Sequence, residues 1–136
     1  MGHTATFLIT ILLLIHPVVA ADLIVGEWLR DDKSSRIQIR VTGGKLSGVI
    51  TYVKDPKRKT DSHNPNKSKR SRPLVGLKVL SGFTKKGAMW EGGTIYDPSN
   101  GKIYKGKVWV QGEKLTMRGY VGVSLIGRTT TWTRHK

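Results

Sequence analysis

Asp61, Ser62 and His63 place three side-chain types that serve in hydrolytic enzymes next to one another. In a Ser–His–Asp triad the carboxylate orients the imidazole, and the imidazole takes the proton from the hydroxyl nucleophile. That geometry needs three separate rigid elements, whereas this run lies in a stretch without hydrophobic periodicity. Adjacency in a loop therefore does not predict a triad.

The other titratable residues form no catalytic or metal-binding pattern either. The chain has no cysteine. Its histidines lie far apart in sequence, at His3, His16, His63 and His135. The acidic residues of the later strands and turns stand singly, at Glu91, Asp97 and Glu113. General acid–base work needs a positioned pair, and metal sites need clustered ligands. We expect no enzyme activity, no metal and no cofactor.

Ligand binding is the chemistry that the remaining residues favour. The candidate aromatic residues are Tyr52, Trp90, Tyr96, Tyr104, Tyr120 and Trp132. Such residues line cavities with an apolar wall and a few hydrogen-bonding groups. Arg118 and Arg128, if a strand turns them inward, suit a ligand carboxylate or phosphate. The alternative is that aromatic residues at alternate strand positions only fill the core.

The segment Lys54–Arg72 holds eight Lys or Arg residues, two Asp and no aromatic residue. Its candidate contact residues are Lys57, Arg58, Lys59, Lys67, Lys69, Arg70 and Arg72. Charge without an aromatic platform supports only weak, salt-sensitive binding of nucleic acid. We interpret the segment as a loop whose charge also suits an anionic membrane or lipopolysaccharide.

The elements that must position these residues are strands. Apolar and polar residues alternate at period two between glycine turns, with no sustained helical period. The predicted strands are Ile24–Arg30, Arg36–Val41, Lys45–Val53, Leu77–Phe83, Ala88–Tyr96, Gly101–Val110, Lys114–Val121 and Gly127–Arg134. Short turns join antiparallel neighbours, and Gly48, Gly106 and Gly119 permit the coiling that closure requires. We expect an all-β, eight-stranded, antiparallel up-and-down barrel, with an interior either filled or large enough for one small ligand.

The long connection between the third and fourth predicted strands is the exception to these short turns. A connection of this length inside a compact domain is usually functional or disordered. Pro73 is placed to begin a short helical turn within Arg72–Leu77, which would pack Leu74 and Leu77 over one end of the barrel. The connection would then act as a lid.

The N-terminal residues 1–20 contain an apolar run, Phe7–Ile15, followed by Pro17 and small residues up to Ala20. This order predicts a signal peptide cleaved after Ala20 or Ala21, and the run is too short to span a bilayer. Because no Lys or Arg precedes the run, an uncleaved anchor stays open as an alternative. We expect a single domain over 21–136, exported to the periplasm or secreted. The net charge of +15 fits contact with acidic envelope polymers or plain solubility.

Several longer motifs carry a resemblance to a known family. They are Gly26-Glu27-Trp28, the segment Arg70–Leu77 with Leu80-Ser81-Gly82-Phe83, the segment Trp90–Pro98, the segment Gly101–Lys107 and the segment Arg118–Arg134. Together they resemble the bacterial exported family DUF2147 over essentially the whole mature chain. The resemblance implies a lipocalin-like, calycin-type barrel, for which the family has no established biochemical role. It also implies that Trp28 closes the barrel floor beneath Arg134, with Arg128 as the second choice of partner.

Two functions follow from these expectations. The first is an exported, non-enzymatic lipocalin-like protein that binds a small, partly apolar ligand in the barrel, an anionic one if the arginines face inward. The alternative is a structural or interaction protein with a packed barrel, whose basic surface docks on anionic envelope components. An open cavity would favour the first function and a filled core the second. The sequence leaves the ligand and the oligomeric state unknown.

Overall fold

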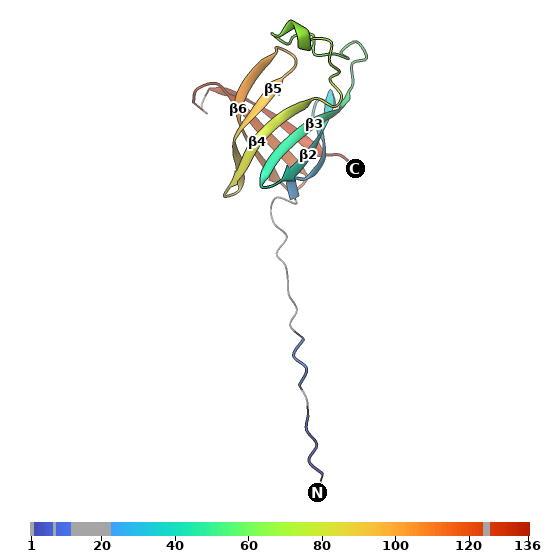
Figure 1. Ribbon diagram of the computed structural model, residues 1–136, viewed down its shortest axis with the longest axis vertical. Helices are drawn as coiled ribbons and strands as arrows, with labels where there is room; N and C mark the ends of the chain where they lie inside the picture. Colours follow the sequence, from blue (N-terminus) through green and yellow to red (C-terminus); the bar gives the residue numbers. More distant parts are fainter. Residues whose placement is uncertain (1, 7, 12–22, 124–125) are drawn as a thin grey trace.

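The computed structural model describes residues 2–6, 8–11, 23–123 and 126–136. Eight strands form one closed barrel in which each strand pairs antiparallel with its neighbours in sequence (Figure 1). The strands are β1 (Gly26–Arg30), β2 (Ser35–Thr42), β3 (Lys45–Val53), β4 (Lys78–Lys86), β5 (Met89–Asp97), β6 (Lys102–Gln111), β7 (Lys114–Tyr120) and β8 (Gly127–Arg134). The predicted all-β up-and-down barrel is confirmed, with strand ends that differ by a few residues.

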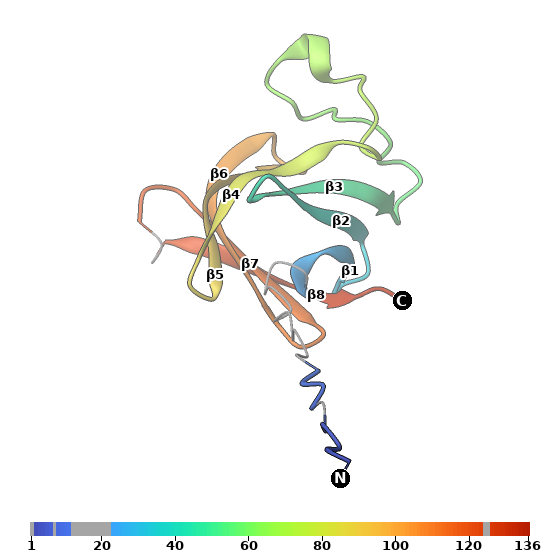
Figure 2. The same cartoon turned by 60° about the horizontal axis from the view of Figure 1, so that its bottom comes forward.

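Closure of the barrel depends on the pairing of the first and last strands. Trp28 of β1 lies opposite Arg134 of β8, and Arg30 lies opposite Trp132. Figure 2 shows β8 beside β1, with the β3–β4 connection standing over another part of the barrel. Because the strands alternate in direction, one end of the barrel carries the β2–β3, β4–β5 and β6–β7 turns, and the other carries the remaining connections. We call these the closed end and the lid end.

Large apolar side chains fill the closed end. Those with almost no exposed surface are Trp28, Leu46, Phe83, Trp90, Val108 and Leu115. Their positions follow the period-two alternation, so that successive inward residues of each strand meet in one core. Phe83 finds room because two glycines face it, Gly93 and Gly106. The glycines therefore create space for an aromatic ring as well as allowing the sheet to coil.

Replacing Gly93 with alanine is expected to lower the free energy of unfolding by about 1 to 3 kcal/mol, the usual cost of overpacking a core. A Cβ at this position would overlap the Phe83 ring and lie 2.6 Å from the Ser81 carbonyl oxygen. Gly119→Ala is the matched control, since its Cβ would meet Tyr104 at 3.4 Å, an ordinary contact. Denaturant unfolding of both variants checks this prediction. Equal stability losses in the two variants would show that the Phe83 contact does not explain the glycine.

The connection between β3 and β4, residues 54–77, is here called the lid. It covers the lid end of the barrel (Figure 1). The structure places its helical turn, η1, at Lys67–Lys69, where Asn66 caps it by accepting a hydrogen bond from the Ser68 N–H at 3.1 Å. The predicted position of the turn, beginning at Pro73, is wrong. Pro73 instead forms an isolated antiparallel bridge with Thr60, which suits a residue that has no N–H to donate.

Leu74 and Leu77 do pack over the barrel end as expected, because both are buried in the main core. The backbone of the lid is tied to itself, since the Asp61 N–H donates to the Arg72 carbonyl at 3.0 Å and the Leu74 N–H donates to the Lys59 carbonyl at 2.9 Å. The lid also packs against the β5–β6 turn, where a Cβ at Gly101 would collide with the carbonyl of His63. The lid is therefore a folded part of the domain.

The N-terminal predictions fall largely on residues that the structure leaves undescribed. The expected cleavage site at Ala20 or Ala21 lies outside the described residues. Within the described part of the chain, no helix has the length and apolar character needed to cross a membrane.

Candidate ligand-binding cavity

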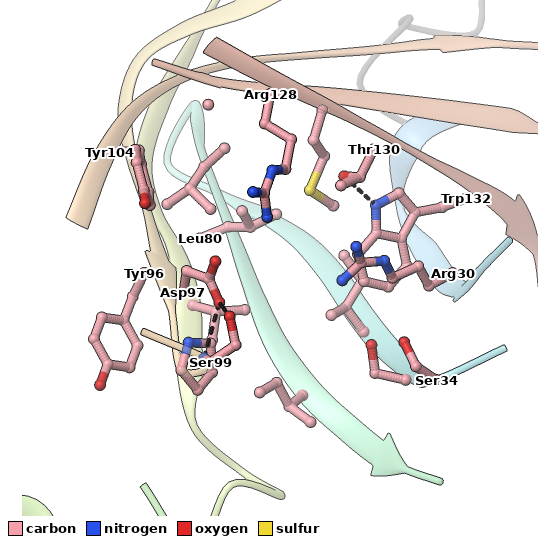
Figure 3. Close-up of a pocket in the computed structure, with 18 of the residues that line it drawn as sticks. Arg30, Ser34, Leu80, Tyr96, Asp97, Ser99, Tyr104, Arg128, Thr130 and Trp132 are labelled. Atoms are coloured by element: carbon pink, nitrogen blue, oxygen red, sulfur yellow. Dashed lines mark hydrogen bonds between the residues drawn. The ribbon is translucent and has the colours of Figure 1, made fainter. Parts of the chain in front are cut away.

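A cavity of about 520 Å³ lies at the lid end of the barrel (Figure 3). This volume is within the range of about 300 to 1,000 Å³ that is usual for small-molecule sites. Apolar side chains from five strands form much of its wall: Ile37, Ile50, Val79, Leu80, Ile95 and Met117. Leu74 contributes from the lid. The barrel is thus filled at its closed end and hollow beneath the lid.

Five of the eight predicted binding residues line this cavity: Tyr96, Tyr104, Tyr120, Arg128 and Trp132. Alternation along β8 places Arg128, Thr130 and Trp132 on the same inward face. The Trp132 indole Nε1–H donates to Thr130 Oγ1 at 3.0 Å. The Tyr104 hydroxyl accepts a hydrogen bond from the Asn100 side-chain amide at 2.8 Å, so its own proton remains to be donated.

The other three predicted binding residues, Tyr52, Trp90 and Arg118, do not line the cavity. Trp90 is buried among the closed-end side chains, where it lies opposite Val108. Arg118 is on the outward face of β7, between the cavity-lining Met117 and Gly119, and donates to Thr129 Oγ1 at 2.9 Å. Both placements follow from strand position and alternation.

Tyr52 is displaced by a bulge. Arg36 pairs with Tyr52 and Ile37 pairs with Ile50, which leaves Thr51 as an extra residue in β3. The extra residue reverses the alternation, so Tyr52 lies outside the cavity although Ile50 lines it. The Arg36 guanidinium stacks over the Tyr52 ring at 4.5 Å from its centroid. The sequence carried no turn residue that would have indicated this bulge.

Several lining residues were not predicted. They come from strand ends, turns and the lid: Arg30, Ser34, Ser35, Arg58, Asp97 and Ser99. Turn residues have no alternation from which to infer a direction. Arg30 is different, because it lies two residues after the inward Trp28 on the same strand. Alternation along β1 would have indicated that Arg30 faces the cavity.

Asp61 anchors the lid from within. The residue is fully buried. Its carboxylate accepts hydrogen bonds from the Tyr96 hydroxyl at 2.5 Å, from the Asn64 amide at 2.8 Å and from Arg72 Nε at 2.8 Å. We call Asp61, Asn64, Arg72 and Tyr96 the latch. Because Tyr96 belongs to β5 and also lines the cavity, the latch ties the lid to the cavity wall.

The latch also explains why Asp61, Ser62 and His63 do not act as a triad. Ser62 Oγ lies 3.5 Å from His63 Nδ1, and both residues are exposed. The buried Asp61 carboxylate instead meets Tyr96, Asn64 and Arg72 in the latch. In the described part of the chain, no three His, Cys, Asp or Glu residues lie close enough to hold a metal ion.

Comparison with known proteins identifies the chain. A family model described as "Uncharacterized protein conserved in bacteria (DUF2147)" matches residues 26–134. The chain belongs to the DUF2147 family. The resemblance carried by the sequence motifs is therefore confirmed. No curated protein matches the sequence significantly.

A solved structure supports the lipocalin-like character of this DUF2147 barrel. Its title reads "Protein HP1028 from the human pathogen Helicobacter pylori belongs to the lipocalin family". The two chains share 28% sequence identity and superpose with a TM-score of 0.74, over 82% of each chain. The closed barrel, the lid-end cavity and the similarity to this solved structure therefore all fit a lipocalin-like fold.

The closed end of the DUF2147 barrel carries the Trp28 and Arg134 pair. The Arg134 guanidinium lies over the Trp28 ring, 4.3 Å from its centroid. It also donates to the Val25 carbonyl at 3.1 Å and to the Leu23 carbonyl, while Trp28 Nε1–H donates to the Ile24 carbonyl at 2.9 Å. Arg134 thus holds residues 23–25 against the closed end of the barrel by hydrogen bonds. Arg128, the second choice for this role, lines the cavity instead.

The basic residues of the DUF2147 lid have different surroundings. The five lysines, Lys54, Lys57, Lys59, Lys67 and Lys69, are exposed. The three arginines differ from the lysines: Arg58 lines the cavity, Arg70 Nε donates to the Asn64 carbonyl at 2.7 Å, and Arg72 belongs to the latch. The composition of the segment does not reveal this difference: Arg70 and Arg72 bind other residues of the lid, Arg58 lines the cavity, and the lysines face solvent.

The ionisation of Asp61 makes the latch sensitive to acid. Burial opposes the charged form, but the hydrogen bonds from Tyr96, Asn64 and Arg72 outweigh it, so the pKa of Asp61 lies below its ordinary value. Burial and the Asp61 carboxylate raise the pKa of the Tyr96 phenol. A depressed folded-state pKa stabilises the protein above the unfolded pKa, and this stabilisation is lost as the pH falls through the folded pKa.

We therefore expect the stability advantage of the native protein over Asp61→Asn to be constant from about pH 8 to pH 5 and to shrink below about pH 4. Denaturant unfolding of both proteins across this range measures the advantage. The comparison cancels the contributions of Asp31 and Asp32, whose pKa values are also lowered by hydrogen bonds. An advantage that is unchanged at about pH 2.5 would contradict the ionised latch.

Proposed function

We propose that this DUF2147 protein is an exported, non-enzymatic carrier that binds one small, partly apolar ligand inside its barrel. The observation that carries the proposal is the cavity of about 520 Å³ beneath the lid, with a largely apolar wall and a few polar groups. Small-molecule sites have this composition, in which the apolar wall supplies affinity and the polar groups fix orientation. The similarity to a protein of the lipocalin family supports a binding function.

The polar groups of the cavity favour binding over catalysis. Asp97 is the only carboxylate among the described lining residues, so it has no second carboxylate to form an acid–base pair. Its Oδ1 accepts hydrogen bonds from the Ser99 N–H at 2.9 Å and from the Ser99 hydroxyl at 2.6 Å. Asp97 thus organises the β5–β6 turn, which is the ordinary role of an aspartate in this position.

The alternative function, a packed barrel that docks by its surface, loses support because the interior is hollow. A docking role beside ligand binding keeps one supporting observation, the exposed lysines of the lid. Attraction between exposed charges is screened by salt. If these lysines dock the protein on an anionic membrane, phosphatidylglycerol vesicles should bind it at low salt and release it at high salt, while Lys57→Gln combined with Lys59→Gln weakens binding. Absence of binding at low salt rejects this role.

Export is supported by the apolar run Phe7–Ile15 and the small residues that follow it. The corresponding test is the N-terminal sequence of the protein recovered from a bacterial host. Cleavage after Ala20 or Ala21 predicts a mature chain that begins at Ala21 or Asp22, found in the periplasm or the medium. An intact N-terminus in the cytoplasmic fraction would reject export.

Native mass spectrometry of the mature protein from its own envelope tests the carrier function most directly. We expect a mass that exceeds the chain by one small molecule, which gentle denaturation then releases for identification. A clean apo mass, together with no saturable binding of any amphiphile in the titrations described below, would reject the carrier function.

A further inference from the structure

The charges around the cavity do not balance. Three arginines line it, and they come from three separate elements: Arg30 from β1, Arg58 from the lid and Arg128 from β8. Asp97 is the single carboxylate among the described lining residues. Cationic groups at the entrance of an apolar cavity must either be solvated by water or be paired with an anion.

Two of these four charged residues already have partners. Arg30 Nε lies 3.3 Å from Asp32 Oδ2, so it has a carboxylate partner at the protein surface. The Asp97 carboxylate accepts the two hydrogen bonds from Ser99 that shape its own turn. The side chains of Arg58 and Arg128 form no ion pair with any residue that the structure describes. An anionic ligand would therefore gain the most binding energy from these two side chains.

Arg128 is the better placed of the two. It shares the inward face of β8 with Thr130 and Trp132, and Figure 3 shows its guanidinium directed into the cavity beside Leu80. Its side chain forms no hydrogen bond with any described residue. A guanidinium stays charged at all physiological pH values and offers a planar fork that matches a carboxylate or a phosphate. The Arg128 fork therefore points at the space that a ligand would fill.

The apolar wall lies next to this cationic group. Ile50 and Met117 come from the middle of β3 and β7, and Leu80 comes from the first half of β4, whereas Arg128 lies near the lid-end start of β8. A bound molecule thus meets a charged group near the entrance and hydrocarbon farther in. Arg58, carried by the lid, lines the same space and brings a second cation to it.

We propose that the cavity selects amphiphiles with a single anionic head group, which Arg128 binds, and an apolar tail, which lies against Leu80, Ile50 and Met117. The inference rests on the proposed carrier function and adds the chemical class of the ligand and its orientation. The head group is a carboxylate or a phosphate, because both match the guanidinium fork. The head group faces the lid and the tail points toward the closed end.

Isothermal titration of the mature protein with decanoate, decyl phosphate and decanol, all at neutral pH, tests the proposal. We expect the better of the two anions to bind at least about tenfold more tightly than decanol, since a hydrogen-bonded charged group contributes at least that much. Comparison of decanoate with decyl phosphate shows which head group is preferred. Inorganic phosphate and acetate, which lack a tail, should bind much more weakly than either anionic amphiphile.

Arg128→Gln is the decisive variant, and Arg118→Gln is its matched control on the outward face of the neighbouring strand. Arg128→Gln should remove the preference for anions and leave decanol binding within about twofold, whereas Arg118→Gln should keep the preference. Arg128→Lys, which retains the charge, should recover part of it. Thermal unfolding of each variant, performed in parallel, confirms that the barrel is folded.

Three results would overturn the proposal: equal binding of decanol and both anions, an unchanged preference in Arg128→Gln, or inorganic phosphate binding as tightly as decyl phosphate. Equal binding of all three amphiphiles would leave the carrier function standing and reject only the anionic head group. If none of the amphiphiles binds and the protein from its own envelope is also apo, both proposals fail.

Discussion

Replacing Trp28 with alanine is expected to lower the free energy of unfolding by about 3 to 5 kcal/mol, the range for removing a large buried aromatic side chain. Trp28 has no exposed surface and lies where β1 pairs with β8 to close the barrel. Its loss leaves a cavity at the floor and removes the surface on which the Arg134 guanidinium stacks. Urea unfolding at neutral pH measures the effect.

Trp109→Ala is the control for this prediction, because Trp109 belongs to the outward face of β6 and is absent from the buried core. We expect it to cost less than about 1.5 kcal/mol. Arg134→Ala, alone and combined with Trp28→Ala, isolates the stacking energy, which should be about 0.5 to 2 kcal/mol. Similar losses in Trp28→Ala and Trp109→Ala would show that the barrel floor contributes no special stability.

The sequence was a good guide to everything that depends on alternation and on turn chemistry. The eight strands and their antiparallel order follow from period-two patterning and short turns, whereas the sequence left open which face of each strand points into the barrel. Gly43 and Gly44 show why the hairpins were predictable: both have positive φ values, 58° and 74°, in the short turn between β2 and β3. Glycine adopts such values without steric cost, and this turn matches the twist of the strands.

The sequence failed where one long-range contact decides the structure. The extra residue at Thr51 moves Tyr52 out of the cavity, although nothing in the local pattern marks a bulge. In the lid, the sequence predicts only a loop around Asp61, because its partner Tyr96 is 35 residues away. A buried carboxylate satisfied by three side chains leaves no periodic trace in a sequence. The lid was therefore recognised as a segment, but not as a folded one.

Replacing Asp61 with alanine is expected to open the lid. The substitution leaves the Tyr96, Asn64 and Arg72 donors without an acceptor, and a hydrogen bond to a charged group contributes about 1.5 to 3 kcal/mol, less at Arg72 because 37% of its side chain is exposed. Because the substitution removes side-chain contacts of the lid and no backbone hydrogen bond between strands, we expect the lid to detach while the strands stay paired. Trypsin reports this opening, since the lid offers cleavage sites at Lys57, Lys59, Lys67, Lys69 and Arg70. Its cleavage should be at least about a hundredfold faster in the variant.

Asp55→Ala is the matched control, because Asp55 is an exposed carboxylate of the same lid that accepts only a local hydrogen bond from the Lys57 N–H at 2.9 Å. It should change the cleavage rate less than about tenfold. If Asp61→Ala is cleaved no faster than Asp55→Ala, then Leu74 and Leu77 hold the lid and the latch is dispensable.

The same cleavage assay tests whether opening of the lid is coupled to occupation of the cavity. If Asp61→Ala is cleaved faster, and if an added anionic amphiphile slows cleavage of the native protein, the two are coupled. Tyr96 supplies the physical reason for such coupling, since its ring lines the cavity while its hydroxyl holds Asp61.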